Sequence, residues 1–256
     1  MSDHTVKSYD DDLASLKQML AQMGGLAEEQ LANAIDAIAK RDTRLADIVI
    51  AGDEKIDALE QQIEEKSILT IAKRQPMAQD LRQIIVAIRI SADLERIGDL
   101  AKNTAKRTHA ISEQMPRKLV SGLTRMGNLA QEQLKNILDA YARNDADKAI
   151  SVWRSDEDID ALYNSIFREL LTYMMEDPRM IGPCTHLLFG TKNMERIGDH
   201  ATNIAENIYF LVHGKAIICL LYTSDAADDL PCVDLGGRRL IKKKYQFPRL
   251  PYQLTL

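Results

Sequence analysis

Apolar residues return every three or four positions through three long stretches early in the chain, which is the spacing of a helix with one buried face. This pattern predicts helices over about residues 12–40, 43–72 and 77–112. The polar residues 41–43 separate the first two helices, and Pro76 favours a new first turn at the start of the third. Three long helices with short connections bury their apolar faces best as an antiparallel bundle.

The second half of the chain repeats the first half. The segment MGGLAEEQLANAIDAIAKRD at residues 23–42 matches MGNLAQEQLKNILDAYARND at residues 126–145 without a gap, at an offset of 103. In the same register, DEKIDAL at residues 53–59 matches DEDIDAL at residues 156–162. The expected fold class is therefore all-α, with two tandem, sequence-related three-helix bundles.

The repeat also divides the chain into expected domains. Residues 1–114 form the first bundle and residues 115–214 the second, with Pro116 inside the linker. From residue 215 the helical period is lost, and we expect residues 215–256 to be non-native or disordered. The string LLYTSDAADDL in this tail resembles translated sequencing-adapter read-through. The alternative is a basic tail that contacts a membrane or a partner protein.

Composition and charge narrow the class of protein. Aromatic residues make up only 5% of the 256 residues, which is typical of a helical protein, and the net charge of −5 is not that of a nucleic-acid binder. The three cysteines lack the spacing of a disulfide framework or a CxxC motif. The N-terminus lacks an apolar core, and no run of eighteen apolar residues occurs. We therefore expect a cytoplasmic protein that meets membranes only peripherally, through its partners.

Paired acidic residues are the candidate chemistry of the chain. The block ERIGD occurs at residues 95–99 and again at residues 195–199, and the repeated DExIDAL block adds a second acidic pair to each half. A spacing of four residues places both carboxylates of a pair on one helix face. The four pairs are Asp53 with Asp57, Glu95 with Asp99, Asp156 with Asp160, and Glu195 with Asp199.

Counting along each helical hairpin brings these pairs to one level. Asp57 and Glu95 both lie about 27–30 Å from the turn that joins their helices, at a rise of about 1.5 Å per residue. We therefore expect four carboxylates close together in each half, at the solvent-facing border of the apolar stripe. Four such groups repel one another unless a cation or protons neutralise them. Oxygen ligands suit Mg²⁺, Ca²⁺, Mn²⁺ or iron rather than a Cys/His zinc site, and Asn103 and Asn203 could support a ligand.

Other readings of the same residues remain open. The carboxylates could be solvated charges that Arg96 and Arg196 balance. A carboxylate-bridged metal enzyme is another alternative, although the Glu-x-x-His signature of such helical proteins is absent. We expect His200 to lie at the surface and Cys184 to be ordinary core.

The motifs together resemble one known family. Six blocks within residues 12–214 carry the resemblance: MGGLAEEQL, DEKIDALE, IAKRQPMAQDLRQI, ADLERIGDLAKNTAKR, LLTYMMEDPR and MERIGDHATNIAENIYFLVHG. In these blocks the chain resembles the PhoU family of phosphate-specific transport system accessory proteins. The resemblance implies two similar three-helix bundles. It also implies that the acidic pairs bind a multinuclear cluster of iron or of another metal, with Mn, Mg, Ca and Zn as candidates.

The resemblance also implies a role and partners. It suggests a non-enzymatic regulatory adaptor that represses the phosphate-starvation response and phosphate uptake. The adaptor would link the ATPase subunit of the phosphate ABC transporter to a phosphate sensor histidine kinase. It would work as a homodimer or a larger oligomer. A purely structural helical bundle is the further alternative.

Overall fold

The structure, a computed structural model, describes residues 2–111 and 117–217 of the chain. The helices of the first half are α1 (Ser2–Lys40), α2 (Thr43–Gly52), α3 (Glu54–Arg74) and α4 (Ala78–Arg107), with a 3₁₀ turn η1 (Thr108–Ala110). Those of the second half are α5 (Arg117–Arg143), α6 (Ala146–Arg154), α7 (Asp156–Glu176) and α8 (Ile181–His213), with η2 (Pro178–Met180) before α8. The described ranges contain no strand, so the expected all-α class is confirmed.

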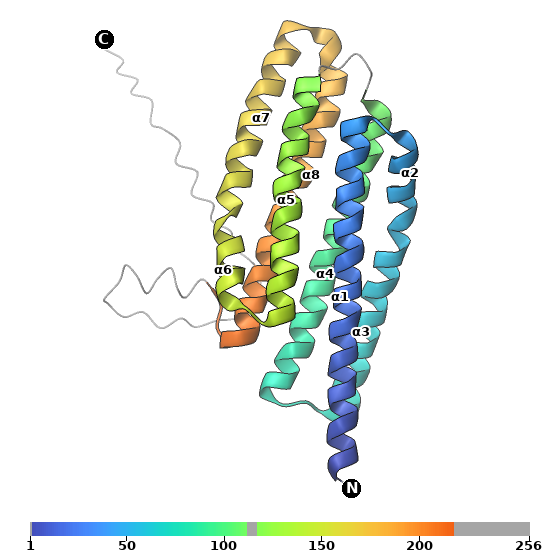
Figure 1. Ribbon diagram of the computed structural model, residues 1–256, viewed down its shortest axis with the longest axis vertical. Coiled ribbons are helices and arrows are strands. Elements are labelled where there is room, and N and C mark those ends of the chain that lie inside the picture. The colour runs from blue at the N-terminus through green and yellow to red at the C-terminus, as the bar shows by residue number, and fades with distance from the viewer. Residues whose placement is uncertain (1, 112–116, 218–256) are drawn as a thin grey trace, which may run out of the picture. The chain divides into compact units, whose positions relative to one another are not determined.

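In Figure 1 the polypeptide runs up, down and up again through the first half, and down, up and down again through the second. Helix α1 packs against α2, α3 and α4, and α5 packs in the same way against α6, α7 and α8. The α3–α4 turn and the α7–α8 turn lie at opposite ends of the molecule in Figure 1. The expected pair of related bundles is confirmed.

The middle helix of each half is interrupted, which differs from the prediction of one unbroken helix over residues 43–72. Helix α2 ends at Gly52 and α3 begins at Glu54, so Asp53 lies at the joint. In the second half Ser155 lies between α6 and α7, and its hydroxyl donates to the carbonyl of Val152 at 2.8 Å. Short polar side chains that bond to nearby backbone favour such breaks, a local effect that apolar periodicity does not report.

The turn after the first helix is built alike in both halves. Arg41 and Asn144 adopt left-handed backbone angles, with φ of 58° and 52°. Asp42 then accepts hydrogen bonds from the amides of residues 44 and 45, and Asp145 accepts one from the amide of Lys148. These N-caps satisfy amides that the helix itself leaves unpaired. The polar break predicted at residues 41–43 is confirmed.

The two halves share one continuous hydrophobic core. Helix α4 packs along α8, and α1 crosses α5. At the crossing, a Cβ at Gly24 would lie 2.7 Å from the Leu138 side chain, and a Cβ at Gly127 would lie 2.7 Å from that of Ile35. Gly24 corresponds to Gly127 in the repeat and Ile35 to Leu138, so the same contact is made twice. Only glycine allows helices to approach this closely.

The predicted tail at residues 215–256 lies almost wholly outside the described residues, as does most of the predicted linker near residues 112–118. The division into domains at residue 114 stays a prediction. Helix α8 closes at Gly214, whose φ of 70° suits a helix C-terminus. Among the helices of the described ranges, none combines the length and apolar character needed to cross a lipid bilayer.

Candidate functional site

The first acidic site lies where the joint between α2 and α3 meets the middle of α4. Asp53 is only 3% exposed, so the expectation that it borders solvent is wrong. Its carboxylate accepts a hydrogen bond from the amide group of Gln30 at 3.2 Å and another from the ammonium group of Lys102. The same ammonium donates to Asp99 Oδ1 at 2.6 Å. The joint and the ERIGD helix are thus tied together by a lysine.

The acidic groups of the first half lie close enough together to shift one another's pKa. Burial raises the pKa of the Asp57 carboxyl, and the charges of Asp53 and Asp99 raise it further. Burial likewise raises the pKa of Glu95, against the lowering effect of Arg96, and Asp99, Glu60 and Asp57 add repulsion. The structure therefore brings the four predicted residues of the first half into one electrostatic cluster.

Lys102 holds the position of a cation within this cluster. Burial alone would lower the pKa of its ammonium group, but the hydrogen bonds to Asp53 and Asp99 raise it above the ordinary lysine value. Arg96 adds contacts at the rim, 3.3 Å from Glu95 Oε2 and 3.7 Å from Asp99 Oδ2. Arg96 is the residue that the alternative reading named as a balancing charge, whereas the lysine was not foreseen.

The second acidic site uses the same helices but a different lysine. Asp156 and Asp160 lie in the first turns of α7, and Glu195 and Asp199 lie on α8. Glu195 is buried at 5% exposure and its Oε2 pairs with Lys192 at 2.5 Å. This lysine precedes the ERIGD block by three residues. The lysine of the first half follows its block by three.

The glycine of each ERIGD block is required by close packing. A Cβ at Gly198 would lie 2.9 Å from Asp156 Oδ1 and 3.4 Å from the amide oxygen of Gln133. A Cβ at Gly98 would lie 3.4 Å from Asp53 Oδ1 and 3.3 Å from the amide oxygen of Gln30. In both halves a carboxylate and an amide oxygen therefore face the glycine.

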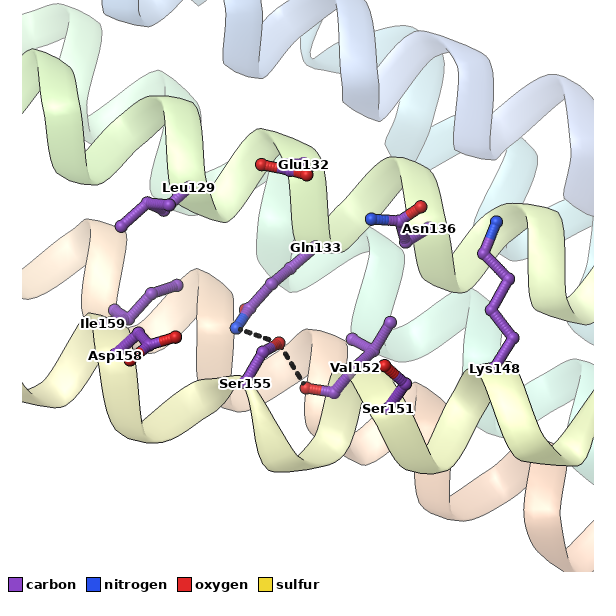
Figure 2. A pocket seen from close by; sticks show the side chains of 10 residues that line it. All are labelled: Leu129, Glu132, Gln133, Asn136, Lys148, Ser151, Val152, Ser155, Asp158 and Ile159. Carbon is purple, nitrogen blue, oxygen red and sulfur yellow. Dashed lines mark hydrogen bonds between the residues drawn. The ribbon is translucent and has the colours of Figure 1, made fainter.

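Gln30 and Gln133 occupy the same position of the repeat and connect each acidic site to a pocket. Both side chains are buried, and neither amide oxygen has a hydrogen-bond partner among the described residues. Figure 2 shows the pocket of the second half, of about 350 Å³, where the Gln133 amide group donates to Ser155 Oγ at 3.1 Å. A pocket of about 410 Å³ lies beside Gln30 in the first half. The repeat thus preserves a pocket as well as the acidic pairs.

The donor set of both sites is suited to a hard cation, because it consists of carboxylates and amide oxygens. The orphaned oxygens of Gln30 and Gln133 and the ammonium groups beside Asp53 and Glu195 show that each site accepts positive charge. In the described part of the chain, however, no three His, Cys, Asp or Glu side chains are arranged to hold a metal ion. A metal would therefore have to displace a lysine and draw the carboxylates together.

The position of His200 in the structure differs from the one expected from the sequence. His200 is half-buried, and its Nδ1 lies 2.9 Å from Asp93 Oδ1, which also accepts from the Asn203 amide at 3.1 Å. This network joins α4 to α8 and gives Asn203 a structural partner. The surface position expected for His200 is wrong, because the packing of the two halves could not be read from either half alone. Cys184 is buried in the core, as predicted.

Comparisons with known proteins agree with this geometry. The family model described as PhoU domain matches residues 20–108 and again residues 123–208. A phosphate-specific transport system accessory protein PhoU homolog from Rhizobium meliloti is 56% identical over 212 residues, which cover 82% of this chain and 90% of that protein.

Two solved structures show the same fold. The crystal structure of PhoU from Pseudomonas aeruginosa is 39% identical, with a TM-score of 0.76 over 81% of this chain and all of that one. The phosphate transport system regulatory protein PhoU from Streptococcus pneumoniae is 30% identical, with a TM-score of 0.76 over 82% of this chain and 99% of that one. These relatives bear the names of accessory and regulatory proteins.

Proposed function

The chain belongs to the PhoU family, and from this we propose that it is a regulatory accessory protein of phosphate transport rather than an enzyme. The match of the family model to both halves is the observation that carries this proposal. The protein would repress the phosphate-starvation response and phosphate uptake. It would do so as a cytoplasmic adaptor between the ATPase subunit of a phosphate ABC transporter and a sensor histidine kinase, working as a homodimer or larger oligomer.

A genetic test separates this adaptor from a purely structural bundle. Loss of the gene should raise expression of a phosphate-starvation reporter in phosphate-rich medium, and the intact chain supplied in trans should restore repression. The transporter ATPase and the sensor kinase should each co-purify with the tagged chain. Unchanged reporter expression after loss of the gene, together with no capture of either partner, would contradict the adaptor role.

The proposal includes metal binding at the two acidic sites. Asp53, Asp57, Glu95 and Asp99 would hold a metal cluster in the first half, and Asp156, Asp160, Glu195 and Asp199 one in the second. The support is the hard oxygen donor set, the burial and the added repulsion that raise the pKa of Asp57 and Glu95, and the lysines already drawn into the clusters. Iron, Mn, Mg, Ca and Zn are the candidates. The metal would neutralise the carboxylates and fix the two helices of each hairpin relative to each other, α3 to α4 in the first half and α7 to α8 in the second.

Elemental analysis of the protein after loading with iron or manganese tests this part. The double change Asp160→Asn and Glu195→Gln should remove the metal of the second half and leave that of the first, with an unchanged helical spectrum. Asp36→Asn serves as the control, because Asp36 is an exposed carboxylate paired with Lys40 and should bind no metal. If the unaltered protein takes up no metal, the site assignment fails while the adaptor role can stand.

A further inference from the structure

The end of α1 and the start of α5 line an open cavity that lies apart from the acidic clusters. It has a volume of about 820 Å³ and is lined by Lys40 and Arg41 at the end of α1 and by Arg117 and Arg125 on α5. Glu132 is the acidic residue of its lining. Four basic side chains around one hollow form a strong local positive charge in a chain whose net charge is −5.

Two of these charges have no counter-ion among the described residues. Neither Arg117 nor Arg125 makes an ion pair within the part of the chain that the structure describes. Lys40 does pair with Asp36 at 2.7 Å, but both side chains are more than half exposed, so this pair is weak and easily exchanged. The cavity therefore keeps guanidinium groups that are able to bind an added anion.

The α5 wall of the cavity is continuous. Arg117, Ser121, Thr124, Arg125 and Asn128 follow one another at spacings of three or four residues or share a turn, so they lie on one helix face. The Ser121 and Thr124 hydroxyls donate to the carbonyls of Lys118 and Val120, at 2.6 Å and 3.1 Å, so the guanidinium groups and the Asn128 amide are the donors that this face offers to an oxyanion.

The internal repeat shows that the fold itself does not require these charges. In the register of the repeat, Ala14 and Gln22 on α1 correspond to Arg117 and Arg125 on α5. The same positions of the repeated helix thus carry arginine in the second half and uncharged residues in the first. The guanidinium groups therefore serve something other than the packing that the two halves share.

We propose that this basic cavity binds a small molecule that carries a chain of two or more phosphates. Guanidinium groups bind phosphate oxygens through paired hydrogen bonds, and several of them at one site favour a polyanion over a single charge. The volume lies within the range of pockets for small molecules and exceeds what one phosphate group fills. The ligand would bridge the end of α1 and the start of α5, and so would join the two halves at one end.

Isothermal titration calorimetry of the full chain with pyrophosphate and with ATP tests the proposal. EDTA is present, so that metal at the acidic sites does not contribute. The double change Arg117→Gln and Arg125→Gln should weaken binding at least tenfold and should reduce its dependence on salt concentration. Arg143→Gln is the matched control, because Arg143 is the repeat equivalent of Lys40 and lies away from the cavity; this variant should bind as the unaltered chain does.

The outcomes are distinct. Binding of both pyrophosphate and ATP supports a site for the phosphate chain, and binding of ATP alone supports a nucleotide site. Equal binding of citrate, a polyanion without phosphate, would overturn the phosphate assignment. Binding that survives the double change, or no binding of either probe at millimolar concentration, would overturn the site. Circular dichroism of the variants separates lost binding from lost folding.

Discussion

The acidic sites of the two halves present the same carboxylates in two electrostatic settings. In the first site Lys102 reaches both the buried Asp53 and the half-buried Asp99, and burial together with the charges of Asp53 and Asp99 raises the pKa of Asp57. In the second site Lys192 reaches the buried Glu195. A fold that keeps its acidic pairs but moves its lysine shows that the negative charge is the preserved feature. The way in which the free protein neutralises that charge varies.

Removal of the lysine at the first site should have the largest effect on stability. Lys102→Met leaves the buried Asp53 without its ammonium partner, and the loss of one member of a buried pair costs about 3 kcal/mol. Urea unfolding at pH 7 in EDTA measures this loss. The repeat offers Thr202→Val as the control, because Thr202 bonds to its own helix at the carbonyl of Asp199, and that change should cost about 0.5 kcal/mol. Equal losses in both variants would contradict the role of Lys102.

Substitution of alanine for Gly98 and for Gly198 should distinguish the effect of tight packing from the effect on the carboxylates. At Gly98 the new Cβ would lie 3.0 Å from Ile56 Cδ1 in the core, and we expect a net loss of about 1 kcal/mol after the gain in helix propensity. At Gly198 it would press on Asp156 Oδ1, a half-buried carboxylate that can move. Gly198→Ala should therefore change thermal stability less than Gly98→Ala but weaken metal uptake more. A stabilisation in both variants would show that neither approach is tight.

The smallest expected effect concerns the charge of Asp57. Its pKa is raised in the folded protein, so the folded state holds the proton to higher pH than the unfolded chain does. The free energy of unfolding should therefore fall as pH rises from the ordinary aspartate value through the raised one. Asp57→Asn removes this decline and should stabilise the metal-free protein at pH 7 by a few tenths of a kcal/mol.

Unfolding of this variant from pH 3 to pH 8 measures the effect, which should vanish below the ordinary pKa of aspartate. Asp36→Asn is the control and should give no stabilisation, because Asp36 is attracted to Lys40 instead of repelled. A destabilised Asp57→Asn protein would mean that attraction to Lys102 outweighs the repulsion. The same series on Asp160→Asn then reports how much repulsion the second site carries.

The helices and the acidic pairs were predictable because they depend on spacing along one helix or one hairpin. Asp57 and Glu95 could be placed at one level by counting from the turn, and in the structure burial raises the pKa of Glu95 and the charge of Asp57 adds to this shift. The break at Asp53 was not predicted, because the residues on both sides of it continue the apolar period. Burial of Asp53 follows from that break.

The lysines and glutamines depend on tertiary packing, which a single helix does not encode. No lysine occupies the position of Lys102 in the second half, so comparison of the two halves did not identify it as a site residue. Gln30 and Gln133 did carry a signal, since both follow a Glu in matching segments of the repeat. Both glutamines are polar residues on an apolar helix face at matching positions of the repeat. This pattern could have identified them as residues that line the buried side of each site.

The doubled contact at the crossing of α1 and α5 has a consequence for the origin of the molecule. Gly24 receives Leu138, and Gly127 receives Ile35, so each half supplies both a glycine and the side chain that fills the partner's groove. Such reciprocity is the signature of a two-fold axis, which arises when two identical chains meet. Duplication and fusion of a gene for one self-associating half would produce this crossing directly. The later divergence of the two copies then freed one end of the crossing to acquire its arginines.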